Sequence, residues 1–215
     1  MTKIVKNAAL ALLFTASAGT QAAISDYLTS SSQGAGWCDA SYSCGAVSAD
    51  RSDINAINTS GGDFYSLGVD GSLMFNVAPL YFNNTGSVVE ITYNTPSPTF
   101  PESARFTFSG ASGTVSADIS NQSTVLEDND GIISGLATSA GSTSFFFDLA
   151  LGIYDTLTVT DTTFMNYLGV YQSNGKKSDG FDVDALNFTV VPEPASLFLL
   201  GAGLLGIISM RRKSS

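Results

Sequence analysis

The chain has 215 residues, with 19 Asp and Glu against nine Lys and Arg, two cysteines and no histidine. Its net charge of −10 argues against nucleic acid or anionic lipid as a partner, because both are negatively charged. The lack of histidine excludes Ser-His-Asp and Cys-His catalysis and every His-ligated metal site. An acidic surface suits divalent cations or neutral glycans, although acidity that only keeps an exported protein soluble is an equally good interpretation.

The first 22 residues, Met1 to Ala22, have the three regions of a secretory signal peptide. Lys3 and Lys6 give a positive start, Ala8 to Phe14 an apolar core too short to span a bilayer, and Thr20-Gln21-Ala22 a small-x-small cleavage site. We therefore expect export through the secretion translocon and removal of this segment after Ala22, or alternatively after the next residue.

The two cysteines, Cys38 and Cys44, are close in sequence. In an exported protein the default prediction is a local disulfide, because oxidised cysteines persist outside the cytoplasm. Two cysteines alone cannot complete a zinc site. The adjacent Trp37 has two open interpretations: it covers the disulfide, or it stacks on a sugar ring.

Between the N-terminal signal and Val190, short runs rich in β-branched and aromatic residues alternate with Gly, Ser, Asn and Asp. No long helical period is recognised there. Asp70-Gly71 predicts a tight hairpin between the first two runs. Residues 23–190 are therefore predicted to form one all-β domain, a β-sandwich of the jelly-roll kind. The predicted strands are 64–69, 72–77, 87–93, 104–109, 113–119, 143–150, 156–160, 164–171 and 181–190.

Alternation within two of these runs predicts which side chains share a face. In 104–109 the apolar residues Ala104, Phe106 and Phe108 are expected to point inward. In 87–93, one face is predicted to carry Val89, Ile91 and Tyr93, and the other Val88, Glu90 and Thr92.

The stretch Ser178 to Phe188 contains the most informative acidic pattern. On an extended strand Asp182 and Asp184 share a face, and two carboxylates about 7 Å apart repel each other unless solvated or bridged by a cation. Calcium prefers oxygen ligands and is the natural bridge in an exported protein. The apolar residues change phase near Ala185, which predicts a bulge there or at Leu186 that turns both carboxylates outward. Solvated acids flanking a turn are an equally good alternative.

This stretch, Asp179-Gly180-Phe181-Asp182-Val183-Asp184-Ala185, resembles the ending of many exported bacterial β-domains. Phe64 to Leu73 also resembles segments of such domains, whose nearest architecture is the galactose-binding-like jelly roll. The resemblance implies a structural Ca²⁺ away from the ligand face, with Asp182, Asp184 and, more weakly, Asp179 as candidate metal ligands. Asp128-Asn129-Asp130-Gly131 is interpreted as an acidic turn, because the glutamate that would complete an EF-hand loop is missing.

The last 25 residues, 191–215, combine a Pro-Glu-Pro triplet, an apolar run and a basic end. Pro192, Glu193 and Pro194 precede Ala195 to Met210, a charge-free run that predicts a short transmembrane helix, and Arg211, Arg212 and Lys213 form the cytoplasmic membrane stop. The order resembles the PEP-CTERM sorting signal of Gram-negative bacteria. The resemblance implies recognition by exosortase, transient anchoring in the inner membrane, and delivery to the cell surface or medium.

Three functions are compatible with these patterns. The first is a non-enzymatic exported surface or extracellular-matrix protein that binds exopolysaccharide or another glycan. The alternative is a glycan-active hydrolase or lyase that uses two carboxylates, for which Glu90, Glu102 and Glu127 are the available glutamates. The third is a purely structural matrix component without a discrete ligand.

Overall fold

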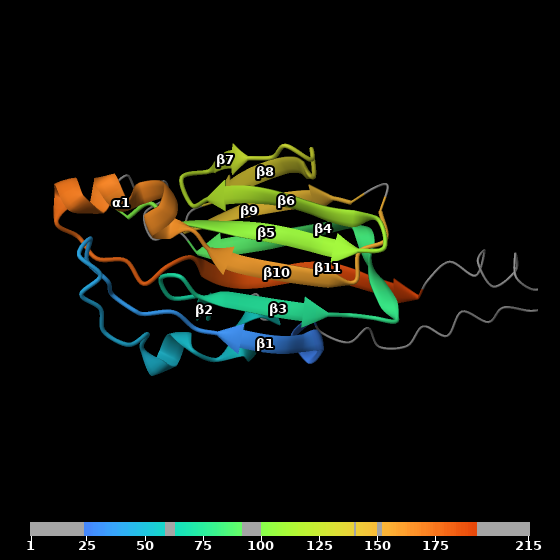
Figure 1. The fold of residues 1–215 in the computed structure, drawn as a ribbon, viewed down its shortest axis with the longest axis horizontal. Helices are drawn as coiled ribbons and strands as arrows, with labels where there is room; N and C mark the ends of the chain where they lie inside the picture. Colours follow the sequence, from blue (N-terminus) through green and yellow to red (C-terminus); the bar gives the residue numbers. More distant parts are fainter. Residues whose placement is uncertain (1–23, 59–62, 92–99, 140, 150–151, 193–215) are drawn as a thin grey trace, which may run out of the picture.

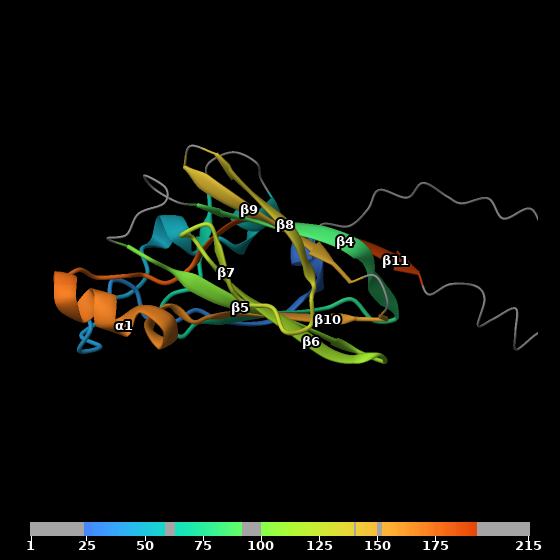
Figure 2. The ribbon, with the colours of Figure 1, turned by 90° about the horizontal axis from the view of Figure 1, so that it is seen from above.

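The computed structural model describes residues 24–58, 63–91, 100–139, 141–149 and 152–192 as two antiparallel sheets packed face to face (Figures 1 and 2). One sheet has the order β1-β3-β10-β5-β6-β7 and the other β2-β11-β4-β9-β8. The prediction of an all-β sandwich is confirmed, and the predicted segments 1–22 and 195–210 lie outside the described residues. The strands are β1 Leu28–Ser32, β2 Tyr65–Ser66, β3 Ser72–Asn76, β4 Leu80–Ile91, β5 Ser103–Gly110, β6 Gly113–Ser120, β7 Thr124–Glu127, β8 Ile133–Ser139, β9 Ser142–Asp148, β10 Thr156–Asp161 and β11 Asp182–Pro192.

Aromatic side chains fill the space between the sheets. Phe106 and Phe108 of β5 are fully buried, as their alternation predicts, and pack on Phe147 of β9 with ring centroids 5.4 and 5.7 Å away. Phe188 of β11 lies 5.4 Å from Phe108. Each ring removes a large apolar area from water, so burial of these rings stabilises the packing of the two sheets.

The predicted hairpin across Asp70-Gly71 is wrong, because the two flanking segments enter different sheets. Tyr65–Ser66 pairs with β11, whereas Ser72–Asn76 pairs with β1 and β10. The chain between them turns at Gly68, which has a φ of +73°, and packs against Gly34. Backbone contact between Gly68 and the segment around Gly34 thus replaces the strand pairing that a hairpin would have made.

The close contact at Gly34 leads to a stability prediction. A Cβ at Gly34 would lie 2.0 Å from the carbonyl oxygen of Val69, so Gly34→Ala is expected to force the backbones apart and cost about 3 kcal/mol of unfolding free energy. Gly169 of the α-helix is exposed with open space around its Cβ position, and Gly169→Ala is expected to stabilise by about 0.5–1 kcal/mol. Chemical denaturation of both variants checks the prediction. Equal effects would contradict it.

The segment predicted as strand 164–171 is instead the α-helix α1, Thr163–Asn174. Phe164, Tyr167, Leu168 and Tyr171 follow the spacing of one helical face and pack beside the disulfide. Gly175 ends the helix in the left-handed conformation, with a φ of +65°. The aromatic content of the segment favoured a strand, whereas its spacing and the following glycine specify the helix. The remaining helical turns are the 3₁₀ segments η1 Ile24–Tyr27, η2 Ala49–Arg51 and η3 Ile54–Asn58.

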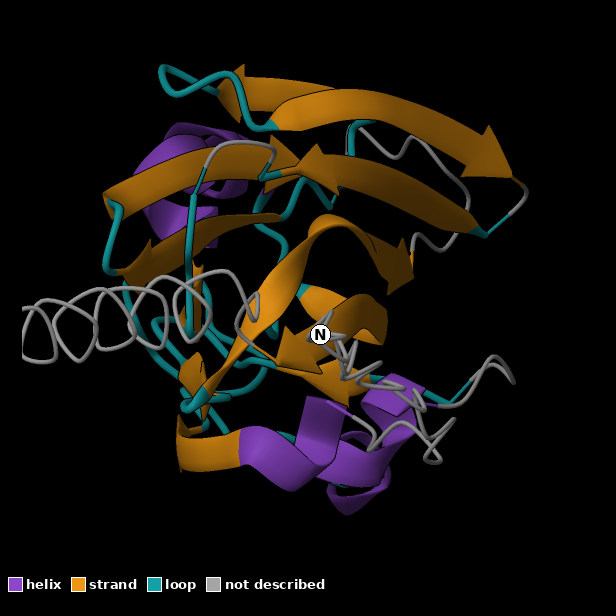
Figure 3. Cartoon of the chain, turned by 90° about the vertical axis from the view of Figure 1, so that its right-hand side faces the viewer, coloured by secondary structure: helices purple, strands orange, loops and turns teal. Residues whose placement is uncertain are grey.

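The two ends of the sandwich differ. Ile24 and Pro192, the first and last described residues, lie towards one end, and α1 lies at the other (Figure 1). Seen from the first end, the helical turns lie at the margins of the strand layers (Figure 3). Within the described ranges, no helix has the length and apolar character needed to cross a membrane.

Candidate functional site: a buried carboxylate cluster

Five carboxyl groups are buried at the α1 end of the sandwich, and we call them the carboxylate cluster. Glu90 is the penultimate residue of β4, Asp161 ends β10 and Asp182 begins β11. Glu102 directly precedes β5, and Asp179 lies in the loop before β11. All five residues are at most 7 % exposed. Because β4 and β11 belong to one sheet and β5 and β10 to the other, the cluster joins the two layers.

Asp161 is fully hydrogen-bonded. Its Oδ1 accepts from the Thr163 hydroxyl at 2.6 Å and the Phe181 N–H at 2.9 Å, and its Oδ2 accepts from the Asp70 N–H at 3.1 Å. Burial raises the pKa of Asp161 to about 6, although these hydrogen bonds favour the charged form. The carboxyl therefore fastens the start of α1, the turn after β2 and the start of β11 to one another.

Asp179 is held by an ion pair with Arg51 of η2. The guanidinium also lies 5.3 Å from the centre of the Trp37 ring and 5.0 Å from that of Phe64, so it is fixed between two aromatic faces. Burial raises the pKa of Asp179, and the charge of Arg51 opposes this rise. Asp179 thus has a dedicated cationic partner.

Glu102 is only partly satisfied. The Ser178 hydroxyl donates to its Oε1 at 3.0 Å, and the Asn121 side-chain amide lies 3.4 Å from its Oε2. Burial raises the pKa of Glu102 well above its usual range, and the charges of Asp182 and Asp179 add to this. Two neutral hydrogen-bond donors offset only a small part of the free-energy cost of burying an ionised Glu102 carboxylate.

Glu90 and Asp182 are the least satisfied members. Both carboxyl oxygens of Glu90 and Oδ1 of Asp182 are buried and accept no hydrogen bond from the described residues. Burial raises the pKa of both groups well above the usual range, and Glu102 and Asp182 raise that of Glu90 further. An uncompensated buried charge is so costly that these groups must hold protons or a cation.

The predicted bulge in the last strand is confirmed. Val183 pairs with Glu90 and Ala185 with Val89, so Asp184 is the extra residue. The expectation that both carboxylates turn outward is wrong, because Asp182 is only 4 % exposed. β11 begins at the α1 end of the sandwich, within the carboxylate cluster. The side chain of its first residue, Asp182, is therefore shielded from solvent.

The three predicted metal ligands are therefore divided. Asp179 and Asp182 both belong to the carboxylate cluster. Burial is the main cause of the raised pKa of Asp182, and the charge of Asp179 is the second. Asp184 is half-buried, and its pKa is raised by burial and then by the charge of Asp63. Its Oδ1 is buried and accepts no hydrogen bond from the residues that the structure describes. In the part of the chain that the structure describes, no three acidic or sulfur side chains already converge as a metal site.

Sequence reasoning did not place Glu90, Glu102 and Asp161 in a site with Asp182. In the structure each of them stands at or next to the end of a strand, whereas the sequence placed Glu90 in the middle of the predicted strand 87–93; only Asp161 directly follows a predicted strand, 156–160. The structure turns the face of β4 with Val88 and Glu90 inward, although the opposite face is the more apolar. Which strand ends meet depends on sheet order, which the alternation of residues does not reveal.

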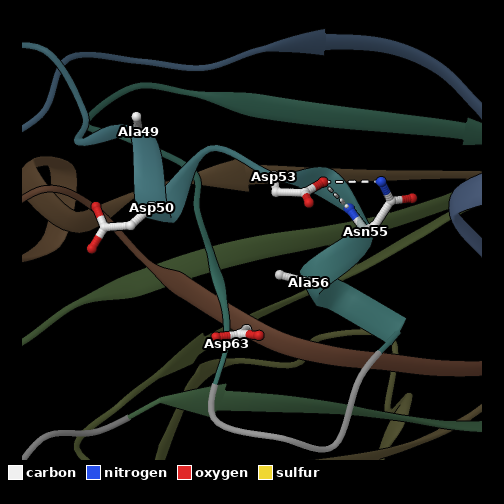
Figure 4. A pocket seen from close by; sticks show the side chains of 6 residues that line it. All are labelled: Ala49, Asp50, Asp53, Asn55, Ala56 and Asp63. Atoms are coloured by element: carbon white, nitrogen blue, oxygen red, sulfur yellow. Dashed lines mark hydrogen bonds between the residues drawn. The ribbon is translucent and has the colours of Figure 1, made fainter.

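A second acidic feature is an open hollow of about 350 Å³ beside η2 and η3 (Figure 4). Asp53 accepts hydrogen bonds of 3.0 Å from the backbone and side-chain nitrogens of Asn55. Asp50 points away from Asp53 and Asp63 in the close view, so the three carboxylates do not converge (Figure 4). The hollow is lined by Ala49, Asp50, Asp53, Asn55, Ala56 and Asp63.

A third feature lies between the disulfide loop and the C-terminal end of α1. The disulfide Cys38–Cys44 is confirmed, and its loop borders a shallow hollow of about 440 Å³. Two aromatic residues of this loop region are exposed, Trp37 at 41 % and Tyr42 at 51 %. The hollow has both polar and apolar walls, and it is lined by Asp39, Ala40, Ser41, Tyr171, Gln172, Gly175 and Lys176.

The interpretation of Asp128 to Gly131 as a turn is supported by its hydrogen bonds. Asp128 Oδ1 accepts from the Ile132 N–H at 2.8 Å and its Oδ2 from the Ile133 N–H at 3.0 Å. Both carboxyl oxygens are thus used within the turn before β8.

The last strand leads directly into the C-terminal segment. β11 ends at Pro192, which pairs with Leu80 at the end of the sandwich away from α1. Residues 190–213 match the model of the PEP-CTERM protein-sorting motif. The chain carries a PEP-CTERM sorting signal. This signal indicates exosortase-dependent sorting to the cell surface, and hence an exported protein that passes through the membrane.

The PEP-CTERM match covers the predicted Pro192, Glu193 and Pro194 and the basic residues Arg211 to Lys213. Of the matched segment, the structure describes Val190, Val191 and Pro192, which form the end of β11. The rest, including the predicted transmembrane helix, lies outside the described residues. Neither the curated proteins nor the solved structures contain a significant match to the chain.

Proposed function

We propose that this PEP-CTERM protein is a non-enzymatic component of the cell surface or extracellular matrix that binds a neutral glycan. Its C-terminal helix holds it in the inner membrane until exosortase acts near the Pro-Glu-Pro triplet. The observation that carries the proposal is the position of the hollow beside the disulfide loop and of the exposed rings. They lie at the opposite end of the sandwich from Val190 to Pro192, where the sorting signal begins.

The separation of the two ends follows from the register of β4 and β11. Val183 pairs with Glu90 near α1, and Pro192 pairs with Leu80 at the other end. Nine residues of strand at about 3.3 Å each span roughly 30 Å. A chain held at its C-terminus would therefore present the disulfide loop and α1 away from the membrane.

The chemistry of this end suits a sugar. Aromatic faces stack on the apolar faces of pyranose rings, and Tyr42 is fixed by an edge-on contact with Phe164 at 5.1 Å. Asp39, Gln172 and Lys176 offer donors and acceptors for hydroxyl groups. The acidic net charge favours neutral over anionic polysaccharide.

The glutamates of the hydrolase alternative lack an accessible arrangement. Glu90 is fully buried, Glu102 is 7 % exposed, and neither lines the two hollows described above. Glu127 lies on β7 and pairs with Arg105 at 3.2 Å. A glycosidase needs two carboxyls flanking a groove that admits the sugar chain, so these positions favour binding over hydrolysis.

We also propose a jelly-roll connectivity of the galactose-binding-like kind. Successive strands cross repeatedly between the layers, since β3 and β5 belong to one sheet and β2 and β4 to the other. All the strand pairings between the described strands are antiparallel, as in this class.

Glycan binding is tested with the full chain purified in detergent, on an array of neutral and anionic glycans. Tyr42→Ala is expected to weaken binding of the selected glycan about tenfold, in line with the loss of about 1.5 kcal/mol of ring contact. Met74→Ala is the matched control, because Met74 is an exposed apolar residue of β3, at 40 %. Equal losses in both variants, or no binding to any glycan, would overturn the proposal.

A further inference from the structure

We propose that the end of the sandwich opposite α1 rests on the lipid headgroups of the membrane, as a second contact besides the C-terminal anchor. Three connections between strands form this end: residues 77–79 between β3 and β4, 111–112 between β5 and β6, and 149 and 152–155 between β9 and β10 (Figure 1). We call them the membrane-facing end. The inference rests on the proposed anchoring of the chain and adds a surface of the folded domain to it.

The last strand leaves the sandwich from within this end. Pro192, the last residue of β11, pairs with Leu80 at the start of β4. The Leu80 N–H donates to the Val77 carbonyl oxygen at 2.9 Å, and the Val77 N–H donates to the Asp155 carbonyl oxygen at 2.8 Å. The exit point of the chain is therefore joined by backbone hydrogen bonds to the β3–β4 connection and, through it, to the β9–β10 connection.

The β5–β6 connection belongs to the same surface. The Ser112 N–H donates to the Ile153 carbonyl oxygen at 3.4 Å, and the Ile153 N–H donates to the Ser112 hydroxyl at 2.8 Å. Gly110 allows this close approach, since a Cβ there would lie 2.3 Å from the same Ile153 oxygen. The three connections thus form one packed surface around the point where the sorting signal begins.

The length of chain between this surface and the predicted transmembrane run is small. Three residue steps separate Pro192 from Ala195, and they reach at most about 11 Å. As a helix, the run 195–210 would be about 24 Å long against a hydrocarbon core of about 30 Å, so part of that reach is used within the membrane. The headgroup layer on each side is about 5–8 Å thick. Pro192 is therefore held at the level of the headgroups or directly above them.

The side chains of the membrane-facing end suit a headgroup layer. Ala78, Pro79 and Ala111 are exposed, and Tyr81 and Ile153 are half-buried. Small apolar groups lose little when they leave water for this layer, and tyrosine is enriched there because its ring is apolar and its hydroxyl is polar. A polar, strongly hydrated surface would instead be kept away from the lipid by its water.

Charge also distinguishes this end in a chain whose net charge is −10. Within the three connections the only charged residue is Asp155, whose Oδ1 accepts from the Thr156 hydroxyl at 3.1 Å. Asp26 of η1 is an exposed carboxylate towards the same end. The hollow at the α1 end, by contrast, is lined by Asp39 and Lys176. Negative charge opposes approach to a membrane that contains anionic lipid, so the domain can approach it most closely through the nearly uncharged connections.

The test measures how far a lipid with a nitroxide on its headgroup quenches tryptophan fluorescence, with the full chain reconstituted into phosphatidylcholine vesicles at pH 7. The parent protein contains Trp37 alone, near α1, and its fluorescence is expected to stay unquenched. Ala111→Trp places an indole on the β5–β6 connection and is expected to lose about half of its added fluorescence, because the headgroup layer encloses it. Ala78→Trp repeats the measurement on the β3–β4 connection, in case the first variant does not fold.

Met165→Trp is the matched control, because Met165 is 64 % exposed on α1 at the opposite end. It is expected to stay unquenched. Equal quenching of Met165→Trp and the two variants at the membrane-facing end would overturn the proposed orientation. If the chain floats with the vesicles but neither of these two variants is quenched, the lipid contact is wrong and this end is free for a protein partner such as the sorting enzyme. A parent chain that does not float with the vesicles would overturn the anchor itself, and this inference with it.

Discussion

In the presence of a chelator, the protein is expected to be most stable near pH 4 and to lose stability as the pH rises to 7. The cause is the raised pKa of buried carboxyls, which makes the folded state bind protons more tightly than the unfolded chain. Burial raises the pKa of Asp161 from 3.8 to about 6, and those of Glu90, Glu102 and Asp182 also rise. The stabilisation that these carboxyls contribute is fully present below their pKa values in the unfolded chain, near 4. It is lost as the pH rises through their higher pKa values in the folded protein.

The size of the effect follows from linkage. A rise of about two pKa units, as at Asp161, corresponds to about 3 kcal/mol of unfolding free energy between pH 4 and pH 7. Asp39 changes the stability in the opposite direction, because a hydrogen bond from the Ser41 side chain lowers its pKa. Asp39 is exposed, and it affects the unfolding free energy only below pH 4. Urea unfolding at constant ionic strength, at pH 4, 5, 6 and 7, measures the slope.

Glu90→Gln is the informative variant for this slope, because glutamine occupies the same volume and does not titrate. It should flatten the pH dependence, whereas Glu127→Gln on exposed β7 should leave it unchanged. An unfolding free energy that is constant or rises between pH 4 and pH 7 in chelator would contradict the prediction.

The strand pattern was predictable because side-chain alternation is a local property. Phe106 and Phe108 point inward as their spacing requires, and the phase change at Ala185 does mark a bulge. Short, exposed strands such as β7, Thr124–Glu127, were not recognised, since they lack a buried face that would produce alternation.

The helix α1 was missed for a different reason. Its aromatic residues favour a strand by propensity, but Phe164, Tyr167 and Tyr171 lie three and four residues apart and so share one face. Packing of this face beside the disulfide decides the conformation. Tertiary contact overrides propensity here, although the spacing was visible in the sequence.

The candidate site was predictable only in part, because it is a product of sheet order. Asp179 and Asp182 stand close together in sequence, whereas Glu90, Glu102 and Asp161 come from three other strand ends. Nothing local to Glu90 indicates that β4 lies between β11 and β9 or that its acidic face turns inward. The pairing of distant strands brings these charges together.

Arg51→Met is expected to cost about 3–5 kcal/mol of unfolding free energy at pH 7, the range for breaking a buried ion pair by removing one partner. Methionine can still fill the space between Trp37 and Phe64, so the loss reports mainly the charge. Without the guanidinium, Asp179 is left buried next to Asp182, and the repulsion between the two carboxylates is no longer offset.

The matched control is Arg105→Met. Arg105 pairs with Asp118 at 2.5 Å and with Glu127, but its side chain is 39 % exposed against 21 % for Arg51, so solvent screens the loss. We expect about 1 kcal/mol for this variant. A cost of Arg51→Met no greater than that of Arg105→Met would show that Asp179 is compensated by other groups.

The pH dependence of the Arg51→Met variant separates charge from packing. Burial raises the pKa of Asp179, and without Arg51 it rises further, so the carboxyl binds a proton more readily as the pH falls to 4 and then depends less on a cation. The cost of Arg51→Met should therefore be much smaller at pH 4 than at pH 7. Adding Asp179→Asn to Arg51→Met should recover part of the stability at pH 7, because it removes the orphaned charge. A cost that is the same at both pH values would mean that Arg51 acts through its contacts with Trp37 and Phe64, and the carboxylate cluster would then not depend on its charge.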